Sequence, residues 1–67
     1  MFIKKQENGK TISEYCIRNV DDIEEMAGML FKQAEFPKTV TATIWGNKHA
    51  VMMRCNDDKR TVFEVSR

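Results

Sequence analysis

The sequence predicts a two-layer α+β domain of order β-β-α-β-β-β, in which an antiparallel sheet packs on one central helix. Three observations lead to this fold: an apolar stripe with helical spacing mid-chain, a hairpin signal before it, and alternating strand patterns after it. A chain of 67 residues suits one small domain. We therefore expect a hairpin over 1–18, a helix over 20–35 and a three-stranded meander over 38–66.

The central helix is predicted by apolar residues that recur at steps of three and four: Ile23, Met26, Ala27, Leu30, Phe31 and Ala34. Asn19 or Asp21 is expected to cap its first turn, and Asp21 with Glu24 has the spacing of a capping box. Phe36-Pro37 is expected to end the helix, because proline disfavours the helical conformation in the residue before it.

The first hairpin is predicted by Asn8-Gly9, since both residues tolerate the positive φ of a tight turn. Pairing of Glu7 with Lys10 would place Ile3 opposite Glu14. Both faces of this hairpin then carry apolar side chains, so the pattern leaves open which face is buried.

The second hairpin is predicted by Gly46-Asn47, taken as a two-residue turn that pairs Trp45 with Lys48 and Ile44 with His49. If Thr61 then pairs with Cys55, a third strand joins the same apolar face. Together with the helix stripe this face gives the predicted core: Ile23, Met26, Ala27, Leu30, Phe31, Val40, Ala42, Ile44, Val51, Met53, Phe63 and Val65.

The composition excludes some classes of function but does not identify one. Eleven basic and ten acidic residues give a net charge of +1, which excludes a strongly acidic DNA mimic and supplies no global basic field. No apolar run follows the charged start or is long enough to cross a bilayer, so we expect a cytoplasmic protein without membrane contact. Cys16 and Cys55 are then expected to be free, buried thiols, or to pair as a disulfide if the protein is exported by another route.

The sequence contains no recognisable catalytic, metal or cofactor motif. His49 is the only histidine and is expected at the rim of the core, not as a base. Cys16, His49 and Cys55 lack the paired spacing of a zinc site, and the three glycines are too scattered for a phosphate loop. We therefore expect neither an enzyme nor a bound cofactor or metal.

The remaining candidate site is the sheet face that points away from the helix. Tryptophan buries on the order of 200 Å², worth roughly 5 kcal/mol, so an outward Trp45 calls for a covering group. The first hairpin, a second copy, another protein or stacked nucleic-acid bases are the alternatives. The residues expected to contact a partner are Thr41, Thr43, Trp45, Lys48, Met52 and Arg54.

These observations favour a small non-catalytic protein-binding module that acts through the sheet face around Trp45 and through strand edges. Adaptors and inhibitors encoded by phages and mobile elements share this size and lack of motifs, an analogy at the level of class only. The partner would be another protein or a second copy in a homodimer. The alternative is a nucleic-acid-binding protein that stacks bases on Trp45 and contacts phosphates through Lys48 and Arg54, but a net charge of +1 disfavours it.

Overall fold

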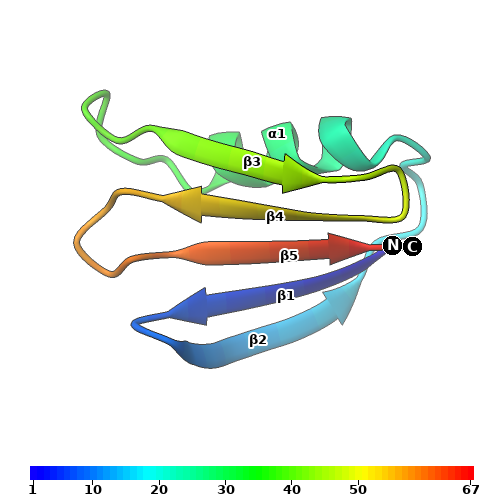
Figure 1. The fold of residues 1–67 in the computed structure, drawn as a ribbon, viewed down its shortest axis with the longest axis horizontal. Helices are drawn as coiled ribbons and strands as arrows, with labels where there is room; N and C mark the ends of the chain where they lie inside the picture. Colours follow the sequence, from blue (N-terminus) through cyan, green and yellow to red (C-terminus); the bar gives the residue numbers. More distant parts are fainter.

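The computed structural model describes residues 1–67 and contains one helix and five strands in the predicted order (Figure 1). The strands are β1 (Phe2–Glu7), β2 (Lys10–Cys16), β3 (Ala42–Gly46), β4 (Ala50–Cys55) and β5 (Val62–Ser66), and the helix is α1 (Ile23–Gln33). Neighbouring strands are antiparallel, in the order β2-β1-β5-β4-β3. The predicted α+β fold, with one helix on an antiparallel sheet, is confirmed.

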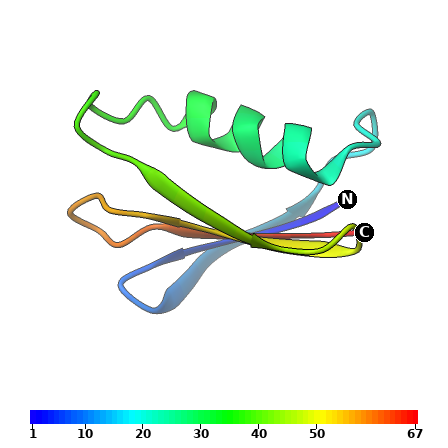
Figure 2. The ribbon, with the colours of Figure 1, turned by 45° about the horizontal axis from the view of Figure 1, so that its top comes forward.

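The two layers leave one side of the sheet bare. Helix α1 packs against β4 and β5 on one side, which we call the inner face (Figure 2). The first hairpin widens the sheet by two strands, because β1 pairs with β5. It does not fold over Trp45. The side away from α1, which we call the outer face, therefore has no second layer.

The helix starts and ends inside its predicted range of 20–35. Asp22, not Asn19 or Asp21, is the N-cap, and its carboxylate accepts hydrogen bonds from the amides of Glu24 (2.9 Å) and Glu25 (3.1 Å). The carbonyl of Asp21 instead accepts a hydrogen bond from the Arg67 guanidinium at 2.6 Å, which holds that residue in the preceding loop.

The end of α1 comes earlier than the proline alone predicts. The last helical residue is Gln33, and Glu35 adopts a left-handed conformation with φ of 54°. This conformation turns the chain out of the helix before Phe36-Pro37 is reached.

The core lies between α1 and the inner face. Its ten buried side chains are Ile3, Ile23, Met26, Ala27, Leu30, Val51, Met53, Cys55, Phe63 and Val65. Ile44 was expected among them but is 47% exposed, because α1 lies over β4 and β5 and β3 is an edge strand. Phe31, Val40 and Ala42 are only partly buried.

The first hairpin has the predicted turn but a different register. Glu7 pairs with Lys10, as expected, around the positive-φ residues of the turn. An irregularity in the pairing next to Lys5 then shifts the register, so that Ile3 lies opposite Tyr15 and not opposite Glu14. Ile3 is buried, which identifies its side of the hairpin as the inner face.

The side chains of the second hairpin lie on their predicted faces of the sheet, although the residues that pair differ from those predicted. Trp45 lies opposite Met52, not Lys48, and Gly46 lies opposite Val51. The Asn47 side chain causes this difference: its oxygen accepts hydrogen bonds from the amides of His49 (2.8 Å) and Ala50 (3.1 Å), which builds a longer loop. The pairing of β3 with β4 is shifted by an even number of residues, so each side chain stays on its predicted face of the sheet.

The second hairpin requires a glycine at position 46, and this requirement can be tested. The φ of Gly46 is +139°, and a Cβ added there would lie 2.3 Å from the Ala50 carbonyl oxygen. We expect Gly46→Ala to lower the free energy of unfolding by about 1–3 kcal/mol from backbone strain alone, measured by urea denaturation. The control is Gly28→Ala, where a Cβ meets nothing within 4 Å and a helical glycine is replaced, so stability should rise by about 0.5–1 kcal/mol. Equal stabilities of the two variants would contradict this reading.

The third strand of the meander pairs as predicted. Cys55 pairs with Thr61 as predicted, because the Cys55 amide donates a hydrogen bond to the Thr61 carbonyl at 2.8 Å. Met53 lies opposite Phe63, also as predicted. Both cysteines are free, but only Cys55 is buried. The expectation of a buried Cys16 was wrong, because that residue lies at the end of the edge strand β2, opposite Phe2.

The loop between β4 and β5 is closed by Asp57. Its carboxylate accepts hydrogen bonds from the amide (2.7 Å) and the hydroxyl (2.5 Å) of the buried Thr61. Burial raises the pKa of the Asp57 carboxyl, but these hydrogen bonds to the charged form outweigh it and leave the pKa below its ordinary value of 3.8.

A depressed pKa in the folded state gives a pH dependence with a definite sign. The stability that Asp57 contributes is fully present above pH 3.8 and is lost as the pH falls through the lower folded value. In chemical denaturation from pH 7 to pH 2, Asp57→Asn should be less stable than the wild type at neutral pH. The difference should shrink below pH 3.8, and a difference that stays constant with pH would show that the charge is not involved.

Candidate functional site

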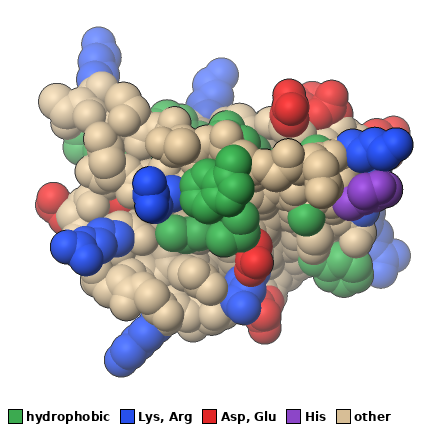
Figure 3. All heavy atoms as spheres, in the orientation of Figure 1, with side chains coloured by type: hydrophobic (Ala, Val, Ile, Leu, Met, Phe, Trp, Pro, Cys, Tyr) green, Lys and Arg blue, Asp and Glu red, His purple; other side chains and the backbone are tan.

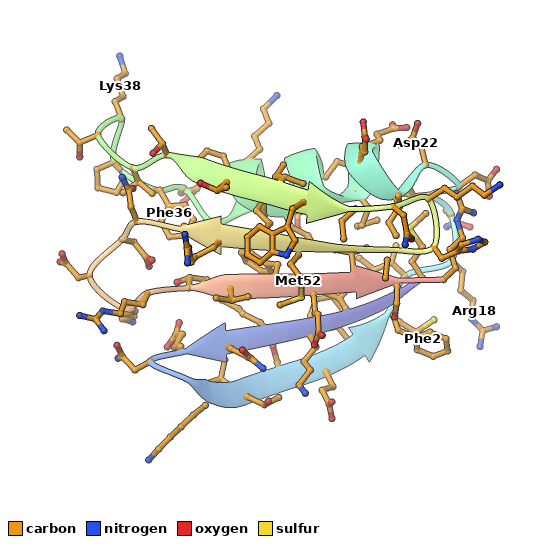
Figure 4. All side chains as sticks on the ribbon, viewed as in Figure 1. Phe2, Arg18, Asp22, Phe36, Lys38 and Met52 are labelled. Carbon is orange, nitrogen blue, oxygen red and sulfur yellow. The ribbon has the colours of Figure 1, made fainter.

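The candidate site is the outer face, where every second strand residue points away from α1. Figure 4 shows Met52 in front of the sheet, on the side away from the helix, and Phe2 at the end of the sheet where the chain termini lie. The pairings assign fourteen residues to it: Phe2, Lys4, Gln6, Thr11, Glu14, Cys16, Thr43, Trp45, Ala50, Met52, Arg54, Val62, Glu64 and Ser66.

Trp45 forms the centre of a small cluster on β3 and β4. Its cross-strand partner is Met52, and the pair next along the strands joins Thr43 with Arg54. The Arg54 guanidinium carbon lies 5.8 Å from the centroid of the Trp45 ring, within the range of a cation–π contact. Trp45 nevertheless remains 46% exposed. We call Thr43, Trp45, Met52 and Arg54 the Trp45 cluster.

Two of the predicted site residues lie outside this cluster. Thr41 precedes β3, and its hydroxyl accepts a hydrogen bond from the Asn56 side chain at 3.1 Å while its amide donates to the same side chain at 2.7 Å. Lys48 was expected opposite Trp45, but the longer loop places it beyond the strand end. Arg67 holds that loop through a 2.8 Å hydrogen bond to the Lys48 carbonyl.

A shallow hollow of about 710 Å³ continues the site across β4, β5, β1 and β2. Phe2 and Cys16 line one side of it and Met52 lines the other. Phe2 is 61% exposed. Hydrophobic side chains gather in the middle of this face with charged side chains beside them (Figure 3). The prediction missed Phe2 because it did not continue the outer face beyond β5; alternation along β1 was the signal that could have found it.

The charges on the outer face cancel. Lys4 and Arg54 are the basic residues of its strands, and Glu14 and Glu64 are the acidic ones. Lys4 and Glu64 lie 3.9 Å apart with both side chains well exposed, so this ion pair contributes little to stability. The face is therefore apolar at its centre and electrically neutral as a whole.

The structure shows little that resembles reactive chemistry. Nowhere do three or more histidine, cysteine or acidic side chains gather in a way that could hold a metal ion. Desolvation, and to a lesser degree the nearby Asp57, raises the pKa of the buried Cys55 thiol, which disfavours the nucleophilic thiolate. His49 lies exposed in the loop after β3, not at the rim of the core where it was expected.

No family model matches the chain, and neither the curated proteins nor the solved structures compared with it contain a significant match. No helix in the structure has both the length and the apolar character that a membrane span requires. The case for a function therefore depends on the residues of the outer face.

Proposed function

We propose that this protein is a small, non-catalytic protein-binding module of the cytosol, an adaptor or inhibitor, whose contact surface is the outer face around the Trp45 cluster. The observation that carries the proposal is the half-exposed Trp45 on a sheet face without a second layer. Burying the rest of that side chain under a partner would contribute roughly 2 kcal/mol, from about 25 cal/mol per Å² of apolar surface.

The composition of the Trp45 cluster supports a protein partner. Tryptophan and arginine are enriched among the residues that dominate binding energy in protein interfaces, and methionine adapts its shape to a contact surface. The contact with Arg54 restricts the Trp45 ring before binding, which lowers the entropy lost when a partner covers it. The hollow beside Met52 offers a place for an apolar side chain of that partner.

Nucleic-acid binding is the second candidate, because Trp45 could stack on a base while Arg54 contacts a phosphate. The neutral outer face argues against it, since the phosphate contacts of Lys4 and Arg54 would be offset by Glu14 and Glu64. Lys48, the other basic residue expected to contact phosphates, lies in the loop beyond the strand end.

The experiment that separates the two is affinity capture from a native lysate with the immobilised protein, run with and without nuclease and over a range of salt. The proposal predicts a discrete protein that survives nuclease and moderate salt and is lost with Trp45→Ala. Met29→Ala is the matched control, because Met29 is also a large exposed apolar residue (38%) but lies on α1 and does not line the hollow. Nuclease-sensitive, salt-sensitive material would favour nucleic acid, and identical capture by Trp45→Ala would contradict both functions.

A further inference from the structure

The sheet has two open edges, and they differ in how well they are protected against adding another strand. The order β2-β1-β5-β4-β3 leaves β2 and β3 as the edge strands. Strand β2 carries a register irregularity opposite Lys5-Gln6 and the charged residues Lys10 and Glu14. Irregular pairing and charge are common protection against edge-to-edge association, so β2 is a poor template.

The β3 edge has neither kind of protection. From Thr39 to Asn47 the chain contains no charged residue and no proline, and it is rich in β-branched side chains. Lys38 and Lys48 flank this stretch on either side. An uncharged edge with strong strand propensity is a template for another strand.

The backbone of β3 shows which groups are available at this edge. The Thr41 carbonyl accepts a hydrogen bond from the Asn56 amide at 3.1 Å, and the Asn47 amide donates to the Ala50 carbonyl at 2.9 Å, so both residues bond toward β4. Because bonding directions alternate along an antiparallel strand, Ala42 and Ile44 direct their N–H and C=O groups outward, away from β4.

We propose that a second copy of this chain adds to β3, antiparallel, about a two-fold axis at Ile44. Residues with outward backbone groups then face each other: Ile44 lies opposite Ile44 of the second copy, and Ala42 opposite Gly46. Trp45 lies beside Thr43 of the second copy, a pairing of aromatic and β-branched side chains that favours strand association.

Charge and exposure favour a second copy as the occupant of this edge. No charged residue lies in the paired stretch, so self-association brings no like charges together there, and both lysines lie outside it. Ile44 and Trp45, which are 47% and 46% exposed, gain cover on opposite faces of the joined sheet. The two outer faces become continuous and place both Trp45 side chains near the axis. Pairing of one edge buries a small area, so the dimer should be weak and depend on concentration.

The test is sedimentation equilibrium of the purified protein from micromolar to millimolar concentration. The wild type should pass from the mass of one chain, 7.8 kDa, to twice that mass as concentration rises. Ile44→Lys places two like charges at the axis and should weaken dimerisation by about tenfold or more. Ile44→Pro removes the outward amide without breaking a bond to β4, and should also give a monomer.

The matched control is Ile12→Lys, which changes an isoleucine of similar exposure (50%) on the other edge strand and should leave the dimer intact. Circular dichroism verifies that each variant is folded. A wild type that stays monomeric throughout, or a dimer that Ile12→Lys disrupts and Ile44→Lys does not, would overturn the inference. So would a monomer whose β3 edge takes up only a strand of another protein. Ile44 lies on the inner face, so Ile44→Lys should retain partner capture, which separates this inference from the proposed function.

Discussion

Replacing Met53 by alanine is expected to lower the free energy of unfolding by about 2–5 kcal/mol. Met53 is fully buried, and it lies in the sheet between Ile44 and Phe63. Truncation removes its contacts with the core and leaves a cavity that so small a protein fills only partly. A chain of this size has a total stability of roughly 3–10 kcal/mol, so this one change should bring the protein close to unfolding. Urea denaturation monitored by circular dichroism measures the loss.

The adjacent residue provides the control for Met53→Ala. Met52 points to the outer face and is only partly buried, so Met52→Ala should cost under about 1 kcal/mol of stability. If the outer face binds a partner, the same variant should weaken that binding while Met53→Ala acts through folding. A similar loss of stability in both variants would show that the two methionines do not lie on opposite faces as described.

Replacing Trp45 by alanine is expected to raise the dissociation constant for the partner by about 30-fold or more, equivalent to about 2 kcal/mol. The variant removes the largest exposed apolar side chain of the cluster and the ring on which Arg54 rests. Its stability should change much less than that of Met53→Ala, because Trp45 packs on one side only. Titration calorimetry with the captured partner measures the affinity.

The specificity of that effect depends on the face, so Met29→Ala again serves as the comparison. Met29 is also a large exposed apolar residue (38%), but it lies on α1, so Met29→Ala changes no residue of the outer face or of the hollow. It should leave the dissociation constant within about threefold of the wild type, which corresponds to less than 1 kcal/mol. A loss of affinity as large as that of Trp45→Ala would place the contact surface elsewhere.

The elements with regular periodicity could be predicted from the sequence. The helix stripe around Met26 and Leu30 and the alternation from Val51 to Val65 each have one arrangement that buries all their apolar residues, so the layers and most of the core followed. Ile44 was wrongly assigned to the core because the pattern shows which face a residue occupies. It does not show how far a single helix extends over that face.

The details that the sequence did not reveal are set by local hydrogen bonding and backbone geometry. Asn47 can turn a chain in several ways, and the longer loop forms because its side-chain oxygen accepts hydrogen bonds from the amides of His49 and Ala50. That choice moved Lys48 out of the predicted site and brought Met52 opposite Trp45. The irregular pairing near Lys5 similarly depends on backbone geometry that no residue type dictates.

The fluorescence of Trp45, the only tryptophan in the chain, reports whether the outer face around it is a contact surface. In dilute protein we expect emission at long wavelength and ready quenching by acrylamide, followed by a blue shift and protection when the partner is added. Emission that is already blue-shifted and protected from acrylamide in the dilute monomer, or that does not change when the complex forms, would contradict this expectation.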